Sequence, residues 1–432
     1  MSHHDAIVVG CGLAGLTAGV RLAESGARVL VLAKGVGATH LAPGTIDVLG
    51  RVEGERVEKP LEALGALGSA HPYARVGADG VRAAADWFAA RVAGGALAPY
   101  AYTGSVEQNT LLPTAVGVAR PSALFPVTMA GGDLQSEAPV LAVGFRGLKD
   151  FHPALLADML TRAGVRARSV ELELVPEGRA DANALGYARA FDDATFRGQV
   201  VGHLSGRKLG GDERIAFPAV LGIKDPHGVW SALERALGRP VFEVPTLPPS
   251  VPGMRVFALL REALRRAGGT LRLNNVVVGA ERAGDRVDAL RVRVGLREER
   301  HAADWIVLAS GGFASGGLEL DSHWAARDVA LGLDVAGVPA AGEPRFTPGY
   351  FDEQPMSRAG IAVDDELRPL DAGGARAYDN VLVAGASIAG ATPWKEKSGD
   401  GISLATGFRA AELILAAGGA PAGLTTASRE GR

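Results

Sequence analysis

A glycine pattern near the N-terminus constrains the fold of this chain more than any other feature. An apolar run at residues 6–9 is followed by Gly10, Gly12 and Gly15, then by a helical stretch and a second apolar run at residues 27–32. Gly10 permits a tight turn, Gly12 lets the backbone approach a phosphate, and Gly15 lets the helix pack close to the strand. The pattern therefore predicts a β-α-β unit in which free amides at a helix N-terminus face an anion.

Length and composition indicate a globular chain of more than one domain. Its 432 residues exceed what one compact core usually holds, so we expect about two or three domains. Hydrophobic residues make up 47% and charged residues 22%, which is typical of globular proteins. The formal net charge is -3, and without a basic excess we expect no nucleic acid partner.

The cysteine and histidine pattern excludes several kinds of site. Cys11 is the only cysteine, which excludes a disulfide framework and a cysteine-ligated iron–sulfur cluster within the chain and favours a reducing, cytoplasmic compartment. Since Cys11 stands in the glycine turn, we expect it to serve packing rather than reactivity. No H-x-x-H or H-x-x-x-H pair occurs, and the adjacent His3 and His4 are read as tail residues, so we expect no metal site. Neither a nucleophile elbow nor a Walker A motif is present.

Nothing in the sequence predicts insertion into a membrane. No apolar run approaches the ~18 residues of a spanning helix, and residues 1–5 lack the cationic segment of a signal peptide. Any membrane association is therefore expected to come through a partner.

Changes in composition along the chain suggest one nucleotide-binding domain with insertions. We assign residues 1–94, 246–317 and 359–418 to this domain, with strands at 271–278, 287–294 and 305–309 and a last helix at 401–417. The proline-rich segment 95–245, with short strands, is read as an inserted cap or substrate domain. Residues 318–358 form a second, small excursion, and residues 419–432 are expected to be a flexible tail.

Two further glycine-bearing strand ends define the fold class. Ser310 and Gly311 follow one buried apolar run and Gly385 follows another, and Gly399 and Gly401 open the last helix. Together with the first turn, which includes Leu13 and Ala14, they match the layout of an α/β, Rossmann-like, two-dinucleotide-binding flavoprotein domain. In that layout the last helix points its N-terminus at the pyrimidine edge of the flavin and stabilises negative charge on the reduced ring.

The turn after the second strand departs from the usual dinucleotide site. An acidic residue that binds an adenosine ribose is expected there, but Lys34 and Gly35 stand in its place. Either the adenosine half is held in another way, as in the fumarate reductase and aspartate oxidase group, or the cofactor is FMN. Lys34 suits a phosphate in both cases. Thr39 lies in the following loop, which faces the ligand crevice of an open parallel sheet.

Several longer blocks resemble one known family. The chain is similar to the B subunit of anaerobic glycerol-3-phosphate dehydrogenase in blocks at residues 33–35, 39–49, 70–73, 147–151, 245–251, 308–312 and 331–335. The resemblance implies an FMN-dependent partner of a catalytic, FAD-bearing A subunit. It also implies an iron–sulfur C subunit that holds the pair at the inner membrane, with electrons passing from glycerol 3-phosphate to quinone. FMN is thus the preferred cofactor, with FAD retained. One departure is that residues 397–401 contain less glycine than the family pattern.

Oxidation of an alcohol beside a phosphate requires a base that accepts the hydroxyl proton, a cationic side chain that binds the phosphate, and a hydride acceptor. We choose His40, in the loop after the second strand, as the candidate base. Arg255, near the start of a helix, is the candidate phosphate ligand, and His71 is taken as structural. Lys395 and Lys397 either lie near an anion or belong to a solvated basic loop.

Three functions remain open from the sequence. The first is a flavoprotein subunit of the glycerol 3-phosphate dehydrogenase, and the second is a self-contained flavin oxidoreductase of the fumarate reductase or aspartate oxidase kind acting on another small anion. The third is a non-catalytic flavin subunit that relays electrons or serves as a scaffold.

Overall fold

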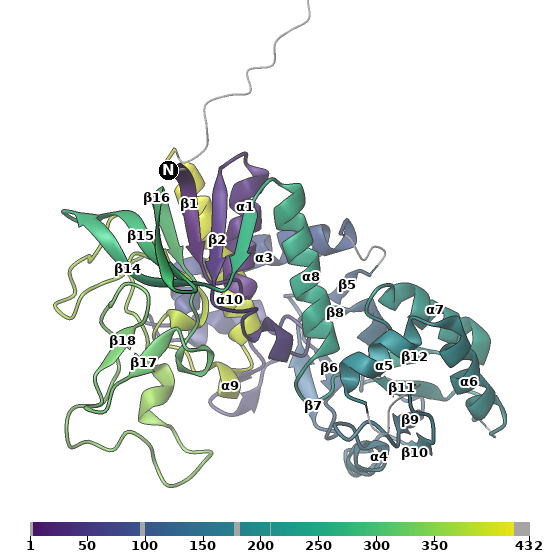
Figure 1. The fold of residues 1–432 in the computed structure, drawn as a ribbon. Helices are drawn as coiled ribbons and strands as arrows, with labels where there is room; N and C mark the ends of the chain where they lie inside the picture. Colours follow the sequence, from purple (N-terminus) through teal and green to yellow (C-terminus); the bar gives the residue numbers. More distant parts are fainter. Residues whose placement is uncertain (1–2, 96–99, 177–181, 208, 419–432) are drawn as a thin grey trace, which may run out of the picture.

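The computed structural model describes residues 3–95, 100–176, 182–207 and 209–418. Figure 1 shows two lobes, a larger one that contains both the first and the last strands of the chain, and a smaller one built from its middle. Each lobe has its own sheet and its own hydrophobic core.

The larger lobe is organised around a seven-stranded sheet. Its order is β13-β2-β1-β16-β15-β14, and β19 pairs with β16. The strands are β1 (His3–Val9), β2 (Val29–Ala33), β13 (Thr270–Leu273), β14 (Asn275–Ala283), β15 (Arg286–Val294), β16 (Arg297–Leu308) and β19 (Val381–Val383). β1 lies parallel to β2 and β16, and β19 lies parallel to β16. The carboxyl ends of these four strands therefore meet at one edge, where an open α/β sheet binds its ligand.

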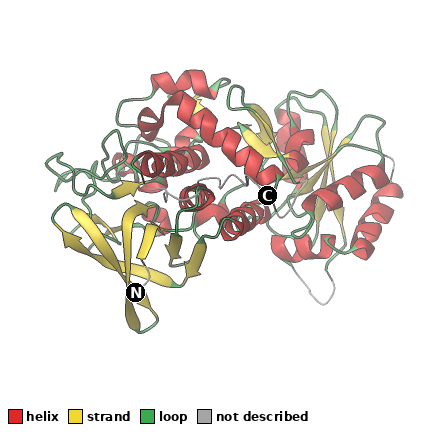
Figure 2. Cartoon of the chain, turned by 90° about the horizontal axis from the view of Figure 1, so that it is seen from above, coloured by secondary structure: helices red, strands yellow, loops and turns green. Residues whose placement is uncertain are grey.

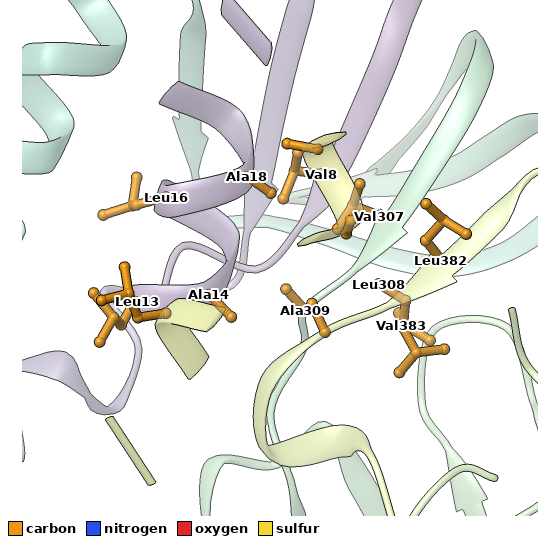
Figure 3. Close-up of a cluster of buried hydrophobic side chains, with 14 of the residues drawn as sticks. Val8, Leu13, Ala14, Leu16, Ala18, Val307, Leu308, Ala309, Leu382 and Val383 are labelled. Carbon is orange, nitrogen blue, oxygen red and sulfur yellow. The ribbon is translucent and has the colours of Figure 1, made fainter. Parts of the chain in front are cut away.

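Four long helices belong to this lobe: α1 (Leu13–Glu24), α3 (Pro72–Ala93), α8 (Val251–Arg266) and α10 (Gly399–Ala416). α1 packs against both α8 and α10, and α10 also packs against α3. Figure 2 shows the strands of the large sheet on one side of the lobe with helices beside them. Apolar side chains of α1, β1, β16 and β19 gather in one cluster (Figure 3), and this core fixes the strand ends relative to the first helix.

The smaller lobe is an α/β unit with a parallel sheet of order β10-β9-β11-β12. Its elements are β9 (Val140–Phe145), α4 (Pro153–Arg162), β10 (Ala167–Leu172), α5 (Ala184–Phe191), α6 (Ala194–Ser205), β11 (Arg214–Pro218), α7 (Pro226–Leu237) and β12 (Val241–Val244). Phe145, Phe191 and Phe217 are completely buried in its core. The sequence analysis expected short strands in this proline-rich segment and missed the helices. Pro153 and Pro226 stand at the first helical position, where proline favours a helix start.

Short elements connect the lobes and rim the larger one. They are β3 (Arg51–Val52), β4 (Glu55–Arg56), α2 (Pro60–Ala63), β5 (Tyr102–Gly104), β6 (Thr110–Pro113), β7 (Ala119–Ser122), β8 (Leu124–Pro126), β17 (Leu318–Leu320), β18 (Ala326–Asp328) and α9 (Pro393–Glu396). Short 3-10 turns lie at residues 38–41, 64–66, 127–132, 313–315, 355–358 and 385–387.

The elements predicted for the larger lobe are present with shifted bounds. The last helix begins at Gly399 rather than Gly401, and the strand predicted at 271–278 is two strands, because Asn274 adopts a φ of 60° between them. The sheet of the smaller lobe lies within residues 95–245, whose limits as an inserted domain stay a prediction. The predicted tail, 419–432, lies outside the described residues. Within the described ranges, no helix is both long and apolar enough to cross a bilayer.

Candidate flavin site

A cavity of about 830 Å³ opens where β1, β2, β16 and β19 end. This volume lies within the range of small-molecule and cofactor sites, roughly 300–1,000 Å³. The wall is formed by the turn between β1 and α1, the loop after β2, the first residues of β14, the turn after β16, residues 329–330, the turn after β19 and the start of α10.

Two glycines of the first turn are required by the protein's own packing. Gly10 has a φ of 107°, and a Cβ there would lie 2.2 Å from the carbonyl oxygen of Ala309. A Cβ at Gly15 would lie 2.0 Å from the carbonyl oxygen of Gly10. Any side chain at either position would therefore separate α1 from the end of the sheet.

Gly12 differs from these two glycines because it faces the cavity. Its backbone is extended, with a φ of -67°, and a Cβ there would meet no protein atom within 4 Å. It is the N-cap of α1, and no side chain caps that helix. The first-turn amides of α1 are thus available to an anion in the cavity, and the positive end of the helix dipole also favours an anion there.

The loop after β2 forms the next part of the wall. Lys34, Gly35 and Thr39 line the cavity, and Lys34 is exposed. The thiol of Cys11 donates a hydrogen bond to the carbonyl oxygen of Gly35, at 3.0 Å, which ties this loop to the glycine turn. Burial raises the pKa of Cys11 to about 11, so its thiol remains protonated at neutral pH. Cys11 therefore has the packing role expected for it.

The other two strand ends and the start of α10 complete the cavity. Ser310 and Gly311 follow β16, and Gly385 follows β19, where its amide donates to the hydroxyl of Thr406 at 2.8 Å. Gly399 and Asp400, at the N-terminus of α10, line the same space. Burial, followed by the charge of Asp47, raises the pKa of Asp400 to about 7.

The structure brings most of the predicted cofactor residues to one cavity. Those in its wall are Gly10, Gly12, Leu13, Ala14, Lys34, Gly35, Thr39, Ser310, Gly311, Gly385 and Gly399. Gly15 and Gly401 are not in the wall, since Gly15 supports the turn and a Cβ at Gly401 would lie 2.3 Å from the hydroxyl of Tyr73.

His40 lies beside the cavity rather than in its wall. Both neighbours in the chain, Thr39 and Leu41, line the cavity, whereas the His40 ring packs edge-on against Phe257 with centroids 4.9 Å apart. Its Nε2 is buried without a hydrogen-bond partner. Burial and then the charge of Arg261 lower the pKa of His40, which favours the neutral ring that a proton acceptor needs.

The phosphate role predicted for Arg255 does not fit the structure. Arg255 is completely buried, and its Nη1 and Nη2 donate to the two carboxylate oxygens of Glu243 at 2.7 and 3.0 Å. Its Nε and Nη2 also donate to the carbonyl oxygen of Gly222. Because its guanidinium is engaged by these partners, Arg255 is a structural residue that joins α8 to β12 and cannot bind substrate.

Several wall residues were missed by the sequence analysis. Asn275 and the first residues of β14 line the cavity, as do Asp400 and Ser403 of α10. The side-chain Oδ1 of Asn275 and the hydroxyl of Thr39 are buried without a protein partner, so both are free to bind a polar ligand. The paired asparagines at 274 and 275, directly before the apolar residues 276–278, were the available signal.

Comparisons with known proteins agree with this geometry. The FAD binding domain family matches residues 5–402 of the chain. A Halobacterium salinarum protein, named as the probable B subunit of anaerobic glycerol-3-phosphate dehydrogenase, is 34% identical over 424 residues, covering 94% of this chain and 96% of that protein. The B subunit of the same dehydrogenase from Pectobacterium carotovorum is 33% identical over 430 residues, covering 96% of this chain and 99% of that protein.

Among solved structures, 3-ketosteroid delta1-dehydrogenase from Sterolibacterium denitrificans covers 96% of this chain and 100% of its own, at 13% identity and a TM-score of 0.47. The family match confirms the predicted α/β flavoprotein fold and a flavin as the cofactor.

Proposed function

Because the chain belongs to the FAD binding domain family and to the family of anaerobic glycerol-3-phosphate dehydrogenase B subunits, we propose that it oxidises glycerol 3-phosphate to dihydroxyacetone phosphate as a flavoprotein subunit. The observation that carries the proposal is the cavity at the strand ends, where three glycine turns and two helix N-termini converge on one ligand space. Such convergence is the geometry that a flavin nucleotide requires.

We propose FAD as the flavin, in place of the FMN preferred from the sequence. The cavity wall runs from Lys34 and Asn275, on the side of β2, past the glycine turn to Gly399 at the start of α10. FMN would fill only the part from the glycine turn toward α10. The region beside Lys34 and Asn275, with the unpartnered Asn275 Oδ1, supports a ligand with an adenosine half.

Different residues around the cavity bind the flavin and accept the substrate proton. The amides of α1 and the Lys34 ammonium bind the phosphates, and the N-terminus of α10 stabilises negative charge at the opposite end of the site. When bound, the flavin supplies the hydride acceptor. His40 is the proposed acceptor of the hydroxyl proton, since burial and the charge of Arg261 lower the pKa of its ring and its Nε2 has no partner in the described structure.

The proposal includes partners. With a single cysteine the chain holds no cysteine-ligated iron–sulfur cluster, so electrons from the flavin pass to another protein of the complex. We propose two partners, an FAD-bearing A subunit and an iron–sulfur C subunit that anchors the complex at the inner membrane and delivers electrons to quinone. The chain itself is then cytoplasmic and peripheral to the membrane.

Reconstitution with the two partner subunits tests this function. We expect quinone reduction by glycerol 3-phosphate in the complete complex, and loss of that activity when this chain is replaced by a flavin-free variant. Full activity with a flavin-free variant would contradict the proposal. Oxidation of a different small acid by the isolated chain would support the self-contained enzyme instead. Undiminished activity of a His40→Gln complex, with flavin retained, would favour an electron relay.

A further inference from the structure

A second cavity, of about 1260 Å³, lies next to the flavin site. The loop that follows β19 contributes Ala384–Ala386 to the flavin cavity and Ile388–Gly390 to this second one. The segment before α10 is shared in the same way, because Lys397 lines the second cavity and Gly399 the first. The two spaces are therefore adjacent at the carboxyl ends of the strands.

One acid in the wall of this second cavity, Glu396, already has its carboxylate hydrogen-bonded by the protein. Glu396 accepts from the amide of Thr392 at 2.8 Å, from the hydroxyl of Ser398 at 2.8 Å and from Nε2 of His71 at 3.2 Å. Burial raises the pKa of Glu396, but these hydrogen bonds outweigh burial and hold it below its usual value. Glu396 is thus an ionised carboxylate whose charge is satisfied by the protein.

Most of the charged groups around it are also paired. Glu353 lies 3.6 Å from Lys395 and 4.0 Å from Arg358, and Arg75 pairs with Asp365 at 2.6 Å. The remaining acid of the wall, Glu53, is exposed in the turn between β3 and β4. Because these cations already have acidic partners, they contribute little electrostatic attraction for a charged ligand.

Two cations of the wall remain without an acidic partner. Arg51 donates to the carbonyl oxygen of Gly54 and Lys397 to that of Trp394, and neither forms an ion pair within the described ranges of the chain. The amide of Gly50 donates to the carbonyl oxygen of Glu396 at 2.8 Å, which holds the two cations close together.

The environment of Lys397 is that of a binding residue rather than a solvated one. Lys397 is half-buried and has a φ of 55°, a backbone conformation that non-glycine residues rarely adopt. Burial, followed by the charges of Arg120 and Arg51, lowers its pKa, and only Asp47, which is paired with Arg120, opposes this. Two cations held together without a carboxylate create a site that an anion would stabilise.

A buried hydroxyl adds a neutral donor to the same wall. Thr392 is 2% exposed and lines the cavity, and its Oγ1 is buried without a hydrogen-bond partner. Buried hydroxyls are almost always hydrogen-bonded in proteins, so an unpartnered one in a cavity wall points to a polar ligand.

We propose that Arg51, Lys397 and Thr392 bind the phosphate group of a small phosphorylated polyol in this second cavity, beside the flavin. The proposal deepens and rests on the proposed function, since it locates the substrate of the same reaction. The proposed phosphate contacts take the role that the sequence analysis assigned to Arg255. Of its two alternatives for Lys397, the proposal adopts the anion site.

Calorimetric titration of the flavin-loaded chain with glycerol 3-phosphate, inorganic phosphate and glycerol tests the site. We expect both anions to bind the wild type and glycerol to bind much more weakly. Arg51→Gln and Lys397→Gln are each expected to weaken anion binding about 10- to 100-fold, because a hydrogen bond to a charged group is lost. Lys397→Arg should retain most of the affinity.

Arg56→Gln is the matched control. Arg56 is paired with Arg51 across the β3-β4 hairpin but is exposed and outside the cavity wall, so this variant should bind both anions as the wild type does. Flavin content and the thermal melting temperature verify that each variant is folded. Wild-type affinity in both glutamine variants of the cavity wall, or no binding of either anion to the wild type, would overturn the proposal.

The outcomes also separate this site from the proposed function. If the reconstituted complex oxidises glycerol 3-phosphate while both variants bind anions normally, the anion site is wrong and the function stands. If the complex is inactive on glycerol 3-phosphate while the two variants lose inorganic phosphate, the anion site is supported and the function is wrong.

Discussion

Substitution of Gly12 separates flavin binding from folding. A Cβ at Gly12 meets no protein atom within 4 Å, and its φ of -67° is allowed for any residue, so the flavin-free protein should tolerate Gly12→Ala and Gly12→Val. The added methyl groups project into the cavity, where the backbone must approach a phosphate. We expect flavin affinity to fall by roughly 1–3 kcal/mol, about 5- to 150-fold, with valine worse than alanine.

The assay is titration of the flavin-free protein with FAD, followed by quenching of flavin fluorescence and by the rise in melting temperature on binding. The flavin-free melting temperatures of the Gly12 variants should be close to that of the wild type. Gly202→Ala, at an exposed helical glycine whose Cβ would also meet nothing, is the control and should bind FAD normally. Normal FAD affinity in Gly12→Val would refute the placement of the phosphates at this turn.

Three further predictions follow from buried groups. Glu243→Gln leaves Arg255 buried without its counter-charge and should lower the free energy of unfolding by about 3–5 kcal/mol in denaturant titrations, and an unchanged midpoint would contradict this. Because burial raises the pKa of Asp400 to about 7, above its unfolded value, the flavin-free protein should lose stability as pH rises from about 4 through 7. Asp400→Asn should therefore gain stability relative to the wild type at pH 8 but not at pH 4, and a pH-independent difference would exclude the effect. The Cys11 thiol, with a pKa of about 11, should react with a disulfide reagent at pH 8 only after unfolding, so rapid modification of the folded chain would show that the turn opens.

Backbone features that depend on contacts within one short segment, such as the glycine turn, could be predicted from the sequence. Gly10 and Gly15 are dictated by contacts within one β-α-β unit, so their spacing alone predicted the turn and its direction. The strand ends at Ser310 and Gly385 were found for the same reason, since an apolar run that ends in small residues is a local signal.

Long-range pairing was not readable in this way. Arg255 lies on a helix start that suits an anion, but Glu243 of β12 and the carbonyl oxygen of Gly222 together accept the hydrogen bonds of its guanidinium. The second cavity was missed for the same reason, since Arg51 and Lys397 lie far apart in the sequence and are brought together by one backbone hydrogen bond from Gly50. The charges of a site can be counted from the sequence, but their pairing depends on tertiary structure.

The central claim is that the cavity at the strand ends holds FAD, and release of the cofactor from the purified chain tests it most directly. Denaturation followed by chromatographic identification should yield one FAD per chain in the wild type and much less in Gly12→Val. Release of FMN, or of no flavin at all, would contradict the account.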